Sequence, residues 1–239
     1  MKVVSFKICP FVQRVTALLE AKGVPYDIKH INLSDKPDWF LKASPNGQVP
    51  ILITDDGHVI FESEAIVEYI DEVTDPTLHP DDPVQKAQAR AWANLASKNC
   101  LVQCSAQRSP DARTLADRAG RLSAAFAKIE QRLGDGPFAG AESIGMVEIA
   151  WLPLLHRTAI IKARSGHDFI EDFPCVKAWQ KDILGTGLAA RSVAGDFEER
   201  FAAFYLAEST YLGQLAHERD GQMCEGEAQG TVERVACCL

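Results

Sequence analysis

A short segment rich in proline and aspartate, residues 75–83, divides this chain of 239 residues into two parts. Before the segment, short apolar runs alternate with turn-forming residues, a pattern typical of strands mixed with helices. After it, strand signals disappear and apolar residues recur at helical spacing. The sequence therefore predicts an α/β domain over residues 1–77, a linker over 78–83 and an all-helical domain over 84–216.

The first part predicts a β-α-β unit followed by a β-β-α unit. The helix of the first unit lets its two strands run parallel, whereas the tight turn at 55–57 joins the next two strands as a hairpin. The expected elements are strands at 3–6, 26–33, 49–53 and 58–61, and helices starting at residue 10, at 37–41 and at 63–73, the last capped by Ser63.

The second part predicts helices only. We expect them at 84–107, 111–133, 146–163, from 174 onward and at 197–216, with the strongly apolar helix at 146–163 in the centre. Gly145 stands at the N-cap position of that central helix, and Glu148 at N3 can reach back to the backbone. Residues 217–239 show little periodicity, and we expect them to be disordered.

Cys9 lies where the first strand gives way to the first helix. Pro10 occupies the first helical position, which tolerates proline because that N–H has no partner within the helix. The free N–H groups and the positive end of the helix dipole favour an anion there. A thiol so placed can have its pKa lowered from about 8.5 to between ~3.5 and ~7.5. We therefore expect a nucleophilic thiolate at Cys9, rather than a buried structural cysteine.

Pro50 opens an apolar run that otherwise reads as a strand, although proline is normally excluded from central strand positions. A cis bond between Val49 and Pro50 at the start of the strand would resolve this conflict. Only about 5% of X–Pro bonds are cis, so the sequence by itself does not establish one here.

The motifs Cys9-Pro10-Phe11, Val49-Pro50 and Glu62-Ser63, spaced over the two units, resemble the thioredoxin-like domain of glutathione transferases. The similarity covers roughly residues 1–80 and is greatest to the cysteine-type, omega-like class. It implies a thioredoxin-like domain followed by an all-helical domain, a cis bond before Pro50, and a cysteine that bonds to glutathione sulfur. Further matches to that class are Asn32-Leu33, Lys36-Pro37, Trp39-Phe40 and Glu68-Tyr69.

The resemblance also assigns the residues that hold glutathione. Val49 offers its backbone N–H and C=O to the cysteinyl part, and Lys36 holds the glycyl carboxylate. Ser63 and the nearby helix N–H groups hold the γ-glutamyl carboxylate, while Glu62 binds the ammonium. Without the family pattern, Glu62 and Lys36 read as solvated charges and Ser63 as a helix cap. The predicted glutathione-binding set is Phe11, Lys36, Val49, Pro50, Glu62 and Ser63.

Cys9 has no resolving cysteine in Cys-x-x-Cys form, because Val12 stands three residues after it. We therefore expect a single catalytic thiol that attacks a glutathionylated sulfur or a thioether and is released by a second glutathione. This predicts a thiol transferase or reductase acting on mixed disulfides or dehydroascorbate. Transferases that use Tyr or Ser instead only stabilise the thiolate of glutathione.

Two other functions remain open at this point. A cysteine-type lyase or etherase would cleave glutathione conjugates with the same thiol. A non-enzymatic interaction protein would use the same scaffold, as chloride intracellular channel proteins do, which carry a similar motif matching Gln13-Arg14. The presence of the whole glutathione set favours an enzyme, whereas the second substrate depends on side chains of the helical domain.

Composition excludes several kinds of partner. A formal net charge of −8 argues against nonspecific nucleic-acid binding, which needs clustered positive charge. No run of about 18 apolar residues predicts a membrane-spanning helix, and lysines interrupt the N-terminus where a signal peptide would be apolar. Seven cysteines without scaffold spacing indicate reduced thiols, and hence a cytoplasmic protein.

No metal site is expected. Cys100 and Cys104 share one helical face, but neither has a His or carboxylate at ligand spacing, which favours packing. Cys104 remains a candidate for the wall of a substrate pocket. The resemblance alone implies a homodimer in which each N-terminal domain packs on the partner's helical domain.

Overall fold

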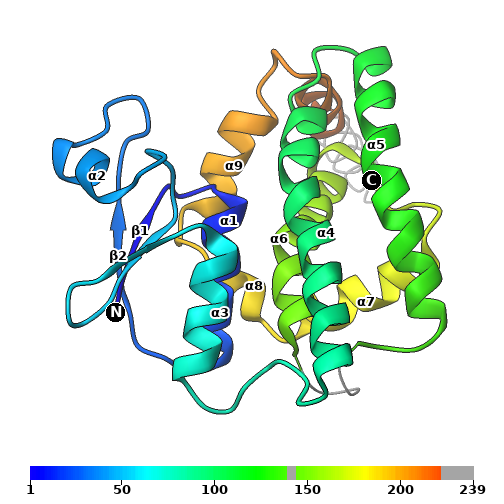
Figure 1. Cartoon of the computed structure of the whole chain (residues 1–239). Helices are drawn as coiled ribbons and strands as arrows, with labels where there is room; N and C mark the ends of the chain where they lie inside the picture. The colour runs from blue at the N-terminus through cyan, green and yellow to red at the C-terminus, as the bar shows by residue number, and fades with distance from the viewer. Residues whose placement is uncertain (139–143, 222–239) are drawn as a thin grey trace, which may run out of the picture.

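The computed structural model describes residues 1–138 and 144–221. A small four-stranded sheet with its helices lies beside a larger group of long helices (Figure 1). The strands are β1 (Lys2–Ser5), β2 (Asp27–His30), β3 (Ile51–Ile53) and β4 (Val59–Phe61). The helices are α1 (Pro10–Ala21), α2 (Asp38–Ala43), α3 (Ser63–Val73), α4 (Pro83–Gln107), α5 (Ala112–Gly134), α6 (Met146–Ser165), α7 (Pro174–Gly185), α8 (Leu188–Arg191) and α9 (Phe197–Tyr205).

The sheet has the order β2-β1-β3-β4. β1 and β2 run parallel, as the α1 crossover requires, and β3 is antiparallel to both β1 and β4. This is the predicted thioredoxin-like arrangement of a β-α-β and a β-β-α unit. The bond between Val49 and Pro50 is cis, and β3 begins only after it, at Ile51.

The two faces of the sheet bury different side chains, because successive residues of a strand point to opposite sides. Val3 and Leu52 pack on α1 and α3 in the main core. Val4 and Ile51 face the other way and pack with Phe40 of α2 in a second, smaller core. The sheet is thereby covered on both faces.

The helical part is built around α6, which is buried along nearly its whole length and packs on both α4 and α1. The expected cap is confirmed: the Glu148 carboxylate accepts a hydrogen bond from the backbone N–H of Gly145 at 3.0 Å. The same carboxylate accepts from Trp179 Nε1 at 3.3 Å, so this cap also ties α6 to α7. None of the helices in the described part is long and apolar enough to cross a membrane.

The proposed linker is held by a buried ion pair. Lys22 Nζ of α1 lies 2.7 Å from Asp71 Oδ1 of α3, and both side chains are almost fully buried. Asp71 also accepts hydrogen bonds from the backbone N–H groups of Leu78 and His79, at 2.8 and 3.3 Å. The chain that leads from the sheet domain to α4 is therefore fixed to α3.

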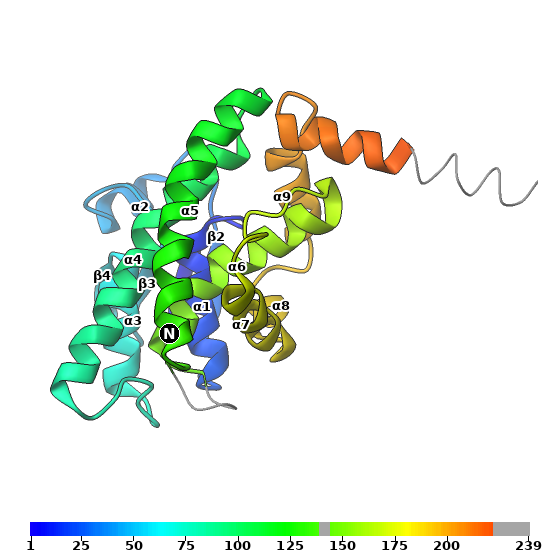
Figure 2. The same ribbon diagram turned by 90° about the vertical axis from the view of Figure 1, so that its right-hand side faces the viewer.

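The single helix expected at 197–216 is wrong, because the structure breaks it into α9 and a second helical segment at 211–221 (Figure 2). Thr210 Oγ1 donates to the carbonyls of Tyr205 and Ala207 and accepts from Gly213 N, which ends one helix and starts the next. A Cβ on Gly213 would lie 2.0 Å from the Ala207 carbonyl oxygen, so this turn requires glycine. The helix runs past residue 217, where disorder was expected, and residues 222–239 lie outside the described part.

Candidate active site

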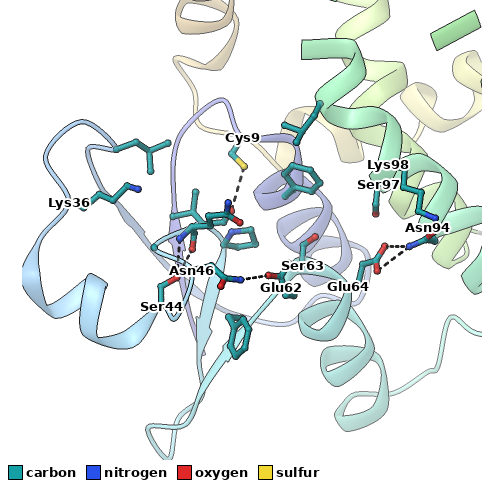
Figure 3. A pocket seen from close by; sticks show the side chains of 18 residues that line it. Cys9, Lys36, Ser44, Asn46, Glu62, Ser63, Glu64, Asn94, Ser97 and Lys98 are labelled. Carbon is teal, nitrogen blue, oxygen red and sulfur yellow. Dashed lines mark hydrogen bonds between the residues drawn. The ribbon is translucent and has the colours of Figure 1, made fainter. Parts of the chain in front are cut away.

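All seven residues predicted for the site line one cavity of about 540 Å³ between the sheet domain and α4 (Figure 3). Cys9 and Phe11 come from the start of α1, and Glu62 and Ser63 from the start of α3. The other polar side chains of this cavity were not predicted from the sequence. They are Ser44, Asn46 and Gln48 of the loop before β3, Glu64 of α3, and Asn94, Ser97 and Lys98 of α4.

Cys9 is the N-cap residue of α1, with φ −73° and ψ 124°, and Pro10 begins the helix as expected. The backbone N–H groups of Phe11 and Val12 interact with its sulfur, as the free donors of a helix N-terminus can. The Cys9 sulfur also lies 3.9 Å from the carbonyl oxygen of Val49, the residue before the cis-proline. The sulfur is therefore placed between the first turn of α1 and the Val49-Pro50 segment.

The predicted lowering of the Cys9 pKa is wrong. Burial raises the pKa of this thiol, and the opposing effects of the Val12 and Phe11 N–H groups and of the Arg157 charge are smaller. Sequence position correctly indicates the helix N-terminus, but it does not report how much water the folded chain removes from the sulfur. Burial therefore disfavours the thiolate form of Cys9.

Arg157 of α6 contacts the turn that carries Cys9. The sequence did not predict a role for this residue. Its side chain is fully buried, and Nη2 donates to the carbonyl of Ile8 at 3.1 Å, one residue before Cys9. Nη1 donates to the Pro153 carbonyl at 2.9 Å and to the side-chain oxygen of Gln13. No carboxylate pairs with Arg157 in the described residues, and its charge lowers the pKa of Cys9.

Glu62 has an unusual backbone conformation at the edge of the cavity. Its φ is +66°, a value that side-chain-bearing residues rarely adopt and that costs on the order of 1–3 kcal/mol. Its carboxylate accepts a hydrogen bond from Asn46 Nδ2 at 2.9 Å, and its carbonyl accepts from Ile66 N at 2.9 Å. Strain of this kind persists where the surroundings hold it, and it is frequent at ligand sites.

Ser63 does not cap α3, contrary to the prediction. Glu62 is the N-cap residue, and Ser63 is the first residue of the helix. The Ser63 side chain is buried against the cavity, so its hydroxyl is available there without a capping role. The N-cap therefore lies one residue earlier than predicted, at Glu62, whose φ is positive.

Charges of both signs face the cavity. Lys36 lies on one wall and Lys98 on the opposite wall, with Cys9 between them (Figure 3). Glu64 accepts hydrogen bonds from Asn94 Nδ2 at 3.1 and 3.4 Å and lies 3.6 Å from Arg14 Nη1. The arrangement suits a ligand that carries two carboxylates and an ammonium group around a central sulfur.

A second cavity of about 630 Å³ lies on the other side of Cys9 and shares Cys9, Phe11 and Leu101 with the first. Cys104, a sequence-based candidate for the wall of a substrate pocket, lines this second cavity and accepts a hydrogen bond from Tyr205 Oη at 3.2 Å. Cys100 is buried and packs inside α4, where burial raises its pKa to about 12. Within residues 1–138 and 144–221, no three potential metal ligands are grouped.

Two family models match this chain. The glutathione S-transferase N-terminal domain covers residues 8–73, and the glutathione S-transferase C-terminal domain covers residues 112–180. Glutathione S-transferase omega-1 of Rattus norvegicus is 34% identical over 185 residues, 75% of this chain and 74% of the relative. A probable glutathione S-transferase of Oryza sativa subsp. japonica, named "DHAR1, cytosolic", is 33% identical over 178 residues, 74% of this chain and 79% of the relative.

A solved structure supports the fold independently. Rice glutathione transferase GST1 in complex with glutathione superposes with a TM-score of 0.74 at 22% sequence identity. The match covers 91% of this chain and 96% of the rice chain. At this level of identity the similarity establishes the common fold of both domains.

The raised pKa of Cys9 predicts a pH profile for its alkylation. Because the thiolate is the nucleophile, the rate with iodoacetamide should rise about tenfold per pH unit from pH 6 to pH 8.5 in the unliganded protein. Peptide mass spectrometry of the Cys9 peptide measures this rate separately from the other cysteines. A plateau already reached below pH 7.5 would show that the helix N-terminus outweighs burial.

Proposed function

The chain belongs to the glutathione S-transferase family, and we propose that it is a cysteine-type, omega-like thiol transferase that reduces mixed disulfides of glutathione. The observation that carries this proposal is the position of Cys9, which lines both cavities at their junction. The first cavity has the charges for glutathione, and the second is mostly apolar. A thiol at the junction can attack a glutathione sulfur while the other half of the disulfide occupies the second cavity.

The proposed reaction has two exchange steps. The Cys9 thiolate attacks the glutathione sulfur of GS–SR, forming the Cys9–glutathione disulfide and releasing RS⁻. A second glutathione thiolate then attacks the glutathione sulfur of that disulfide, releasing oxidised glutathione and regenerating Cys9. The N–H groups of Phe11 and Val12 and the charge of Arg157 stabilise the sulfur anion in each step. The same thiol would serve dehydroascorbate-type reduction.

We place glutathione in the first cavity as the resemblance implies. The backbone of Val49 pairs with the cysteinyl part, with Pro50 and Phe11 beside the sulfur. Lys36 binds the glycyl carboxylate. The free N–H groups at the start of α3, together with Ser63, bind the γ-glutamyl carboxylate, and Glu62 binds the ammonium.

The names of the relatives and the free cysteines bear on the compartment in which the protein works. The rat relative is named an omega-1 transferase, and the name of the rice relative states that it is cytosolic. All four cysteines in the described part are free thiols. We therefore propose a cytoplasmic enzyme, with glutathione as co-substrate. The two cavities around one thiol favour this function over an interaction protein without activity.

Replacing Cys9 should abolish the proposed reductase activity. Oxidised glutathione should add one glutathione to the wild-type protein at Cys9, whereas Cys9→Ala should remain unmodified at that stoichiometry. Cys104→Ala serves as the control, because it removes a second cavity thiol and leaves Cys9 in place. Intact-protein mass spectrometry distinguishes the cases. Equal modification of wild type and Cys9→Ala would assign the chemistry to another cysteine.

The same pair of proteins tests the class of transferase. Conjugation of glutathione to an aromatic chloride should be weak in the wild type, because Cys9 traps the sulfur as a disulfide. The rate should stay equal or rise in Cys9→Ala. A wild-type conjugation rate typical of Tyr-type transferases would contradict the proposal.

Removing the charge of Glu62 should weaken glutathione binding more than catalysis. The lost charge-assisted hydrogen bond is worth about 1.5–3 kcal/mol, or roughly ten- to a hundredfold in affinity. The bond is remote from the sulfur and is made equally in ground and transition states, so KM should rise while kcat changes little. The comparison is Glu62→Gln with Glu72→Gln, an exposed carboxylate on α3 outside the cavity.

Calorimetry with S-methylglutathione separates binding from chemistry, because this ligand cannot form a disulfide. An unchanged dissociation constant in Glu62→Gln would contradict the placement of the γ-glutamyl end at Glu62. Ser63→Ala should also weaken binding but leave the unfolding temperature near that of the wild type, because Ser63 does not cap α3.

We also propose a homodimer. β4 is an edge strand, and its Val59 and Phe61 side chains are about two-fifths exposed, at 39% and 41%. Exposed apolar residues on an edge strand favour cover by another surface. Light scattering at micromolar concentration should give twice the 26.2 kDa mass of one chain. A mass of one chain at that concentration would contradict the dimer.

A further inference from the structure

The second cavity differs from the first in the sign of its charges. Its charged side chains are Arg108, at the C-terminus of α4, and Arg118 of α5. No Asp or Glu is among the described residues that line it, whereas Glu62 and Glu64 face the first cavity. This contrast stands out in a chain whose formal net charge is −8.

Neither guanidinium is neutralised within the described part of the chain. Arg118 Nη1 donates to the Ser105 carbonyl at 2.9 Å, which fixes the side chain across α4 and α5. The Arg108 guanidinium lies 5.1 Å from the centre of the Phe204 ring. Residues 1–138 and 144–221 place no carboxylate within ion-pair distance of either arginine. Each guanidinium therefore keeps N–H donors for an anion.

Apolar and aromatic side chains form the remaining walls. Phe6, Phe11, Phe204 and Tyr205 supply four rings around the cavity. Leu101 and Phe204 are exposed, at 66% and 44%, although both are large apolar side chains. Covering such groups is favourable, and rings pack well on other rings. The walls therefore fit a flat apolar group.

We infer that the second substrate is an aromatic anion, bound with its ring among these side chains and its carboxylate on Arg108 and Arg118. Arginine matches a carboxylate with two parallel hydrogen bonds. The inference rests on the proposed function, since it names the group that leaves Cys9. In the mixed disulfide GS–SAr, where Ar is the aromatic group that carries the carboxylate, the glutathione half occupies the first cavity. The ArS⁻ half leaves from the second cavity.

Two substrates that differ in one charge test this inference. The first is the mixed disulfide of glutathione with 4-mercaptophenylacetate, and the second is the mixed disulfide with the corresponding carboxamide. The net reaction in each case is GSH + GS–SAr giving GSSG + ArSH. For the wild type we expect kcat/KM to be about tenfold higher for the acid than for the amide, as one charge-assisted bond provides.

Variants of the two arginines assign the preference to the cavity. In the double variant Arg108→Gln/Arg118→Gln, kcat/KM for the acid should fall to that of the amide, which itself should change less than about twofold. Arg108→Lys/Arg118→Lys keeps both charges and should retain part of the preference. Arg121→Gln removes an exposed arginine of α5 that does not line the cavity, and should behave as the wild type.

The outcomes separate this inference from the proposed function. Equal kcat/KM for acid and amide in the wild type, or a preference unchanged in the double variant, would overturn the inference and leave the thiol transferase intact. Absence of turnover with both disulfides would overturn the thiol transferase, and the inference with it. Calorimetry of 4-methylthiophenylacetate and its amide checks the same preference without any chemical step.

Discussion

The buried guanidinium of Arg157 is the contact on which the site depends. A cation without water costs several kcal/mol unless its donors are satisfied. Here the carbonyls of Ile8 and Pro153 and the side chain of Gln13 accept from Nη1 and Nη2, whereas Nε has no hydrogen-bond partner and no carboxylate pairs with the group in the described residues. Because Ile8 precedes Cys9 and Gln13 lies one turn after it, a single side chain of the helical domain holds both flanks of the reactive turn.

The positive charge of Arg157 acts on three thiols, those of Cys9, Cys100 and Cys104. The charge of Arg157 lowers the pKa of Cys9, while burial of the same sulfur raises it by more. His156 adds no second positive charge near neutral pH, because burial and the neighbouring Arg157 lower its pKa to about 4. Its Nδ1 lies 2.9 Å from Nε2 of Gln13. Enclosing the thiol and keeping it ionised are thus opposed requirements, and at Cys9 the effect of burial on the pKa is the larger one.

The two cavities take most of their polar side chains from different domains. The first takes most of its polar groups from the sheet domain, where the starts of α1 and α3 and the loop before β3 meet. The second takes its arginines from α4 and α5 and Phe204 and Tyr205 from α9. Cys9 lies where they join, so groups from both domains surround its sulfur.

Local patterns determined the order of the elements, the turn at Cys9 and Pro10, and the motifs that identify the first cavity. These follow from residues adjacent in sequence, whose spacing and turn propensities decide the backbone. Tertiary structure alone decided the raised pKa of Cys9, the contact with Arg157, the one-residue shift of the α3 cap from Ser63 to Glu62, and the charge of the second cavity. Each depends on burial or on groups distant in sequence, such as Ile8 and Arg157, whose contact no local pattern encodes.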